Sequence, residues 1–237
     1  MLQARGTVVT VPDPSAPFLD VLLPVGSRTL AAHANAVTCV LVGRTGPLRL
    51  ECDGRRIDAD VLLVRPGVVH AVALAERGAD VLYLNGLPFP FDAPLAQVLG
   101  GVLAHLASDA LRGERCAMHE LRARLTASAP RLPTSIAEVV RAIYADPMQR
   151  MSQRELALRL RMERPRALRC LKAATGQTFR ELKRWSALQH AAQRMAEGAL
   201  VRTAAMDAGF ADTAHLSRVF RRGFGLTPSA AIAGLER

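Results

Sequence analysis

Apolar residues in the first third of the chain recur in short runs that are typical of strands. Leu48, Leu50 and Cys52 alternate with polar neighbours, which is the period of a strand with one buried face. Three mostly apolar runs, at 37–42, 61–64 and 81–84, also have the length of strands. Turn-forming residues separate these runs, and the pair Asp53-Gly54 favours a two-residue hairpin. The pattern predicts a small antiparallel barrel or sandwich between about residues 21 and 84.

The apolar period becomes helical after this region. A continuous apolar stripe predicts a helix from about Asp92, and a second helix is predicted from about Met118 to Leu125. The stripe consists of Leu95, Val98, Leu99, Val102, Leu103 and Leu106. It has more apolar surface than one barrel face needs, so packing on the barrel and a dimer seam both stay open. Pro130 and Pro133 lie among small polar residues, which predicts a linker over 126–134.

The last hundred residues predict seven helices. The first begins at Thr134 or Ser135, and Ser152 with Glu155 forms a capping box for the next. A second capping box, Thr178 with Glu181, begins a long helix that ends near Gly198. The remaining helices are predicted at about 164–175, 201–208 and 213–222 and from Pro228 onward. They form two three-helix units that share the long helix.

These two units repeat the same layout 49 residues apart. In the second unit the inward positions are Leu216, Val219, Phe220 and Gly223, and the outward positions are Ala214, Ser217, Arg218 and Arg221. Asp212 or Thr213 can cap this helix and Gly225 can end it with a left-handed residue. The first unit places Ala167, Cys170 and Leu171 inward, Leu168, Arg169 and Lys172 outward, and Gly176 at the end. Each unit therefore predicts a helix with a short basic face.

Charge is distributed unevenly between the two halves. The chain of 237 residues has a net charge of +10, and residues 134 to 237 contain 18 Lys and Arg against 9 Asp and Glu. Residues 1 to 133 contain 13 against 12, so almost the whole excess lies in the helical part. Arginine dominates it, and the guanidinium fork suits phosphates and guanine edges. The charge predicts a polyanionic partner for the C-terminal half.

Four cysteines show no paired spacing. Cys39, Cys52, Cys116 and Cys170 form no CxxC motif, and no signal peptide or apolar run of membrane-spanning length is present. A protein of the reducing cytoplasm with buried or idle thiols is expected, with no membrane partner. Neither a metal nor another cofactor is predicted.

One stretch carries a family resemblance. Residues 209–228 read GFADTAHLSRVFRRGFGLTP, and the chain from 134 to 237 resembles the DNA-binding domain of AraC/XylS-type transcriptional regulators. The first unit, ELALRLRMERPRALRCLKAATGQTF, is similar but looser. It has Glu163 in place of a capping serine, Ala167 in place of a large apolar residue and Leu171 in place of the usual phenylalanine.

The resemblance implies two recognition helices that read successive major-groove segments on one side of a duplex. The implied DNA contacts are Arg164, Arg166, Leu168, Arg169 and Lys172 in the first unit and Thr213, Ala214, Ser217, Arg218, Arg221 and Arg222 in the second. Arg169 and Arg218 occupy the matching arginine position. Arg221 and Arg222 are placed for backbone phosphates. The irregular first helix is expected to choose the promoter and the second to anchor the domain.

The N-terminal domain is similar to the cupin-type sensory barrel that often precedes this domain. Asp60 to His70 looks like the second cupin motif, with Pro66-Gly67 as its turn, whereas His33 and Asn35 are the nearest candidates for the first motif's ligands. One good histidine makes a poor metal site. An effector pocket is predicted at Arg28, His33, His70 and Tyr83; buried, hydrogen-bonded histidine is the alternative for His70.

The sequence thus predicts an α+β protein of two domains. Residues 1–125 form a cupin-like effector-binding and dimerisation domain with following helices, 126–134 a linker and 135–237 an all-α DNA-binding domain. The expected partners are double-stranded promoter DNA, a small-molecule effector, a second copy of the chain and RNA polymerase; whether transcription is activated or repressed stays open. A cupin-type enzyme with a DNA-binding tail is the alternative, and the missing metal ligands disfavour it. A fused DNA-repair methyltransferase is disfavoured by the absence of a reactive or zinc-binding cysteine cluster.

Overall fold

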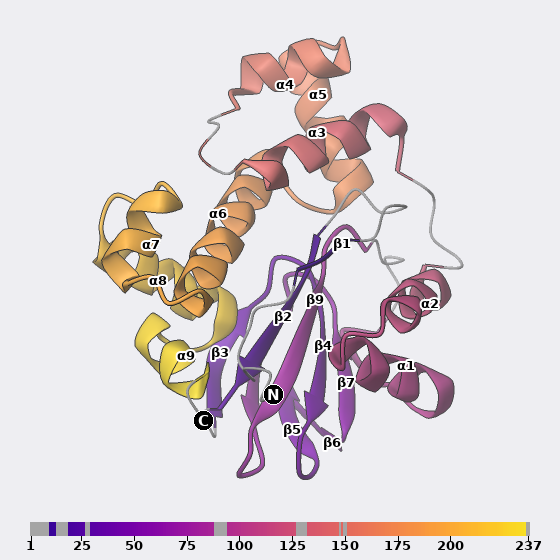
Figure 1. The fold of residues 1–237 in the computed structure, drawn as a ribbon. Coiled ribbons are helices and arrows are strands. Elements are labelled where there is room, and N and C mark those ends of the chain that lie inside the picture. The colour runs from indigo at the N-terminus through magenta and orange to yellow at the C-terminus, as the bar shows by residue number, and fades with distance from the viewer. Residues whose placement is uncertain are drawn as a thin grey trace.

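The computed structural model describes residues 10–12, 19–26, 29–87, 94–126, 132–146, 148 and 151–235. Two antiparallel sheets occupy the N-terminal part and helices the rest (Figure 1). The larger sheet has the order β1-β2-β9-β4-β7-β10 and the smaller sheet the order β3-β8-β5-β6. The prediction of a two-domain α+β protein is confirmed, with the strands in two facing sheets.

The larger sheet consists of β1 (Thr10–Pro12), β2 (Leu19–Val25), β9 (Ala79–Leu84), β4 (Thr38–Gly43), β7 (Val61–Val64) and β10 (Ala96–Val98). The smaller sheet consists of β3 (Thr29–Ala34), β8 (Val69–Ala73), β5 (Leu48–Cys52) and β6 (Arg55–Ala59). Asp53 and Gly54, with φ of 50° and 68°, form the predicted two-residue turn between β5 and β6.

The larger sheet is buried on both faces, which explains the uninterrupted apolar runs. Leu41 and Tyr83 face the smaller sheet and share a core with Leu50 and Val72. Their neighbours on the opposite face, Val40 and Leu82 among them, pack against α1 (Gly101–Leu111) and α2 (Arg115–Leu125). Alternate residues of a strand point to opposite faces, so a strand between two layers is apolar throughout.

The prediction of a helix over residues 96–98 was wrong. These residues form the edge strand β10, which pairs with β7 in antiparallel register, and Asp92 lies outside the described residues. The helix begins only at Gly101, which adopts the left-handed φ of 52° after Gly100. The apolar stripe is divided as a result. Leu99 is buried and Leu103 and Leu106 pack against the sheet, whereas Leu95, Val98 and Val102 are exposed.

Seven helices follow in the described C-terminal part. They are α3 (Thr134–Ala145), α4 (Gln153–Leu160), α5 (Arg164–Thr175), α6 (Phe179–Ala196), α7 (Val201–Asp207), α8 (Thr213–Phe224) and α9 (Pro228–Leu235). The capping box of Thr178 and Glu181 begins α6, and Ser152 accepts a hydrogen bond from the amide of Glu155 at the start of α4. Left-handed Gly176 and Gly225 end α5 and α8. The predicted order of seven helices is confirmed.

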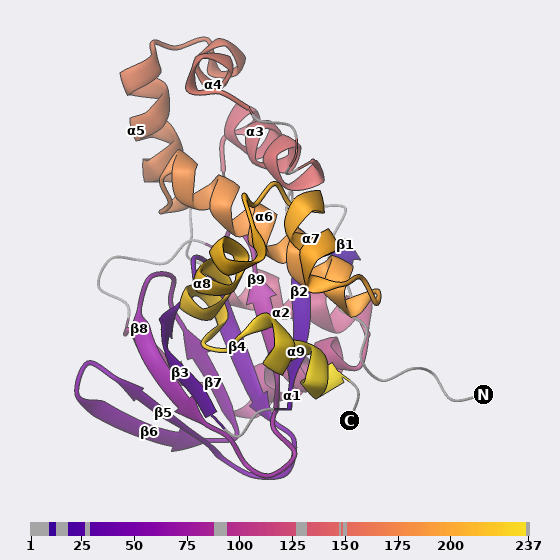
Figure 2. The same ribbon diagram turned by 90° about the vertical axis from the view of Figure 1, so that its left-hand side faces the viewer.

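The two parts share one core instead of meeting only through a linker. Figures 1 and 2 show α8 and α9 against the strands, while α3, α4 and α5 stand away from them. Phe220 and Phe224 of α8 and Trp185 of α6 belong to the same apolar cluster as the facing sides of the two sheets. Tyr83 of β9 packs edge-on against both Trp185 and Phe224, with 5.3 Å between ring centres in each pair.

Candidate nucleic-acid interface and the cavity beside it

The second recognition helix, α8, presents the outward face that its sequence predicted. Asp212 Oδ1 accepts a hydrogen bond from the amide of His215, which satisfies one unpaired donor of the first turn. Leu216 and Phe220 are fully buried beneath it. The predicted contacts Thr213, Ala214, Arg218, Arg221 and Arg222 are exposed, and Ser217 is half-buried. The helix therefore places small side chains and three arginines on one accessible surface.

The first recognition helix, α5, is more basic and less regular. Its N-cap residue, Glu163, makes no side-chain capping bond, and Pro165 lies in the first turn, where its missing N–H costs no helical bond. Ala167 and Leu171 are fully buried under the helix. Arg164, Arg166, Arg169 and Lys172 are exposed. Leu168 is half-buried and packs against the core of its own unit, so less of its side chain faces outward.

The arginines of both recognition helices are available to an outside partner. Arg169 in α5 and Arg218 in α8 are separated by the 49-residue repeat and are both exposed. Among the residues that the structure describes, no acidic side chain forms an ion pair with Arg164, Arg166, Arg169, Arg218, Arg221 or Arg222. A polyanion would meet uncompensated positive charge on both helices.

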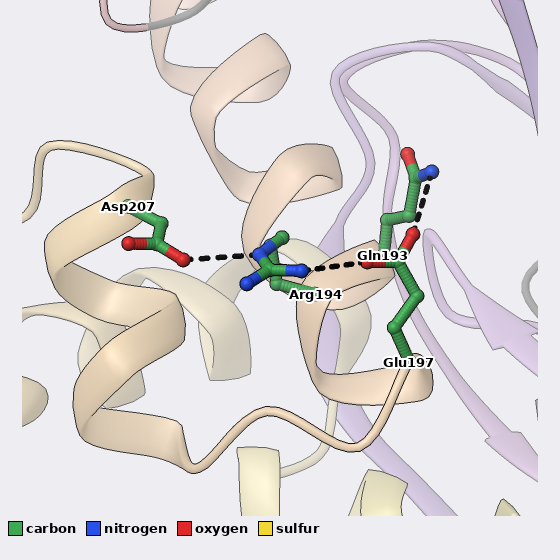
Figure 3. Close-up of polar contacts among 4 residues, drawn as sticks. All are labelled: Gln193, Arg194, Glu197 and Asp207. Carbon is green, nitrogen blue, oxygen red and sulfur yellow. Dashed lines mark hydrogen bonds and ion pairs between the residues drawn. The ribbon is translucent and has the colours of Figure 1, made fainter.

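An ion-pair network fixes the second unit to the long helix (Figure 3). Arg194 of α6 donates from Nε to Asp207 of α7 at 3.0 Å and from Nη1 to Glu197 at 2.8 Å. The hydrogen bond to Asp207 is the main cause that raises the pKa of Arg194, and the bond to Glu197 adds to it. Figure 3 shows the guanidinium between the two carboxylates, which connects α7, the helix preceding α8, to the shared axis.

A cavity of about 530 Å³ lies between the strands and the helical part. One wall is formed by Ala34–Ala36 and Pro66-Gly67, and the other by the start of α6 and one side of α8, which includes part of its exposed surface. Four arginines line it: Arg180, Arg184, Arg218 and Arg222. The carboxylate of Glu181 also lines it, but already accepts a hydrogen bond from the amide of Thr178 in the capping box. The balance of charge suits an anionic ligand.

Of the predicted effector residues, His33, His70 and Tyr83 do not line this cavity. Arg28 is outside the described residues, and Tyr83 is buried in the shared aromatic cluster. His33 and His70 face each other across β3 and β8, with 4.3 Å between ring centres. His70 borders a shallower cavity of about 400 Å³ beside Cys52. The larger cavity escaped sequence analysis because its lining comes from four distant segments that share no local pattern.

The buried pair His33 and His70 should make the stability of the fold depend on pH. Burial, and then the neighbouring His70, lowers the pKa of His33 from 6.5 to about 4, and burial also lowers the pKa of His70. Below pH 6.5 the unfolded chain therefore binds protons that the folded chain does not bind, so stability falls as the pH falls towards 4. We expect the free energy of unfolding to decrease by about 2 kcal/mol for His33 between pH 7 and pH 5.

Urea unfolding at the two pH values measures this difference. His33→Gln should reduce the decrease, whereas His105→Gln, at an exposed histidine in α1, should keep it. An identical pH dependence in wild type and His33→Gln would contradict the assignment.

The basic double unit and the family model that matches it indicate a DNA-binding transcriptional regulator with a helix-turn-helix domain. The family model for the helix-turn-helix domain matches residues 156–233, which confirms the resemblance drawn from the sequence. No match was found among the curated proteins.

Solved structures of ToxT from Vibrio cholerae share the fold over nearly the whole chain. ToxT from strain O395 has a TM-score of 0.61 at 12% identity, covering 91% of this chain and 96% of the other. The same protein bound to (E)-4-(8-methylnaphthalen-1-yl)but-3-enoic acid gives a TM-score of 0.61 at 12% identity, with 91% of this chain and 97% of the other covered. ToxT from strain SCE256 with a bound unsaturated fatty acid gives 0.53 at 13% identity, with 90% and 93% covered. No helix in the described part of the present chain has the length and apolarity needed to cross a bilayer.

Proposed function

We propose that this chain is a sequence-specific transcription factor that places α5 and α8 in successive major-groove segments of promoter DNA. The observation that carries the proposal is the repeated exposed arginine, Arg169 and Arg218, on two helices joined by the capped helix α6. Arginine donates two parallel hydrogen bonds to guanine, and the flanking basic residues suit phosphates. Residues 135–237 are the reading domain, residues 1–125 the sensing domain and 126–134 the linker.

Selection of bound sequences from a random DNA pool with the purified full chain tests this function. Two conserved half-sites about one helical turn apart are expected among the selected fragments, because each recognition helix needs its own major-groove segment. Recovery of fragments without any common sequence would contradict sequence-specific reading.

The cavity between the two parts is the proposed effector site, and its ligand is a small carboxylic acid. Arg180 and Arg184 reach it from α6, and Arg218 and Arg222 reach it from α8. The ligands named in two of the ToxT structures, an unsaturated fatty acid and a butenoic acid, are also carboxylic acids. A carboxylate among arginines would form charge-assisted hydrogen bonds, while Trp185 and Leu188 offer apolar contact.

Thermal unfolding with an unsaturated fatty acid and its methyl ester tests the charge requirement. We expect the acid to raise the midpoint, because a ligand that binds only the folded chain stabilises it. The ester should have little effect. Arg184→Ala should reduce the response, and Arg202→Ala, at an exposed arginine outside the cavity, should leave it unchanged. Equal shifts with acid and ester would contradict an anion site.

The apolar edge beside β10 is the proposed dimer contact. Leu95, Val98 and Val102 are exposed there, at the open side of the larger sheet. Burying three such side chains between two copies would remove apolar surface from water. RNA polymerase is the proposed further partner at the promoter, and the cytoplasm is the proposed location.

A further inference from the structure

The turn that follows β3 touches both recognition units at once. Asn35 Nδ2 donates a hydrogen bond to the carbonyl oxygen of Gly223 at 2.5 Å, in the last turn of α8. The carbonyl of the next residue, Ala36, accepts a hydrogen bond from Nε2 of Gln177. Gln177 directly follows Gly176, the left-handed residue that ends α5. Two consecutive residues of the sensing domain therefore contact both recognition units: Asn35 donates to a carbonyl at the end of α8, and Ala36 accepts from the residue that follows the end of α5.

Strand β3 makes a further contact that, like that of Asn35, donates to a carbonyl at the C-terminal end of α8. The amide of Ala31 in β3 donates to the carbonyl oxygen of Gly225 at 2.9 Å. The last carbonyls of a helix have no partner within the helix, and they need one when they are buried. Gly223 and Gly225 are buried, so the sensing domain supplies the bonds that α8 lacks at its C-terminal end.

Asn35 is held rigidly enough to act as a fixed point. The residue is only 2% exposed, and its Oδ1 accepts a hydrogen bond from Cys39 Sγ at 3.1 Å. Its backbone carbonyl accepts a hydrogen bond from the amide of Gly67 at 2.8 Å. Contacts within the N-terminal domain therefore fix the orientation of the side-chain amide that bonds to α8.

The end of α8 lies close to both β3 and α6. A Cβ atom added to Gly225 would lie 2.5 Å from His33 Nδ1 and 2.8 Å from the Ala31 carbonyl oxygen. A Cβ added to Gly223 would lie 2.6 Å from Leu188 Cδ2 on α6. The C-terminal end of α8 is therefore packed closely between α6 and β3, with no space for a side chain at either glycine.

We propose that Asn35 is a positioning residue for DNA reading: together with Ala36 it sets the relative placement of α5 and α8, and so the half-site spacing that the chain accepts. The proposal rests on the proposed function, because it needs both helices to bind DNA. A single long helix joins the two units, and the contacts of Asn35 with Gly223 and of Ala36 with Gln177 fix the rotation of each unit about that helix. Groove spacing in DNA is periodic, so a change in this placement changes which spacing fits.

Binding of the full chain to a series of DNA fragments tests the proposal. Each fragment carries the two selected half-sites, with the spacer lengthened or shortened by one base pair at a time. Wild type should prefer one spacer by about tenfold or more over its neighbours. Asn35→Ala should reduce that preference to about threefold or less, while affinity for a fragment with a single half-site stays within about twofold. Gln177→Met, which keeps the side-chain length but removes the donor, should act in the same direction.

Gln193→Met is the matched control, because its side-chain amide bonds to Glu197 of the same helical segment and to no other residue that the structure describes (Figure 3). It should keep the wild-type spacer profile. Urea unfolding identifies a variant that fails to fold, and Gln177→Met then decides the outcome. An unchanged spacer profile in folded Asn35→Ala and Gln177→Met would overturn the proposal, even if overall affinity rose. If wild type bound none of the fragments, the proposed function would fail instead.

Discussion

Arg218→Ala is expected to weaken binding to the selected operator by about 1 to 3 kcal/mol, which is a large part of the difference between specific and non-specific binding. Arg218 is exposed near the middle of α8, whose N-terminal residues are small, so the helix can approach base edges closely. Loss of a bidentate contact should also relax sequence preference at the base pair beneath it. Titration of operator and scrambled DNA at one fixed salt concentration measures both effects.

Arg169→Ala is the equivalent change in α5. It should weaken operator binding by a similar amount and relax the sequence preference in the half-site that α5 contacts. Arg221→Ala provides the contrast, since its predicted partner is a phosphate. This change should weaken binding to all DNA sequences by a similar factor. It should also reduce the slope of log affinity against log salt concentration by about one. Operator affinity that stays unchanged in Arg218→Ala would refute its assignment, and a sequence-selective loss in Arg221→Ala would refute the phosphate contact.

Asn85→Ala is expected to reduce the free energy of unfolding by about 3 kcal/mol. Asn85 is fully buried at the end of β9, where its Oδ1 accepts hydrogen bonds from Trp185 Nε1 at 2.9 Å and from the Tyr144 hydroxyl at 3.0 Å. Its backbone carbonyl accepts a further bond from Arg122 Nη2 of α2 at 2.8 Å. One residue thus links a strand to α2, α3 and α6. Removal of the amide takes an acceptor from the buried indole of Trp185 and the half-buried hydroxyl of Tyr144, and leaves a cavity.

Urea unfolding, followed by tryptophan fluorescence, measures the effect directly because Trp185 is the chain's single tryptophan. Gln193→Ala removes a half-buried amide that hydrogen-bonds to Glu197 near the end of α6, and it should lower the free energy of unfolding by less than about 0.5 kcal/mol. If Asn85→Ala lowered the free energy of unfolding as little as the control does, the buried network would contribute little to joining the two parts.

The helices of the C-terminal half could be predicted closely because the signals that define them lie within a few residues of each other in the sequence. Capping residues Asp212 and Thr178, the left-handed glycines 176 and 225, and the inward positions of α8 all specify structure within a few residues. The strand runs and the Asp53-Gly54 turn were equally local. The edge strand β10 was not, because its apolar residues also fit a helical period, and only pairing with β7 decided its conformation.

The sequence by itself determined the two recognition helices, their basic faces and the class of partner, since periodicity, capping and charge act over short distances along the chain. Tertiary structure alone decided how those helices are held. Asn35 was noted in the sequence as a weak candidate for a metal ligand, yet in the structure it caps a helix 188 residues away. The arginine-lined cavity and the Asn85 network likewise combine residues from distant segments. Such contacts depend on the packing of whole domains, and no local pattern of residues encodes them.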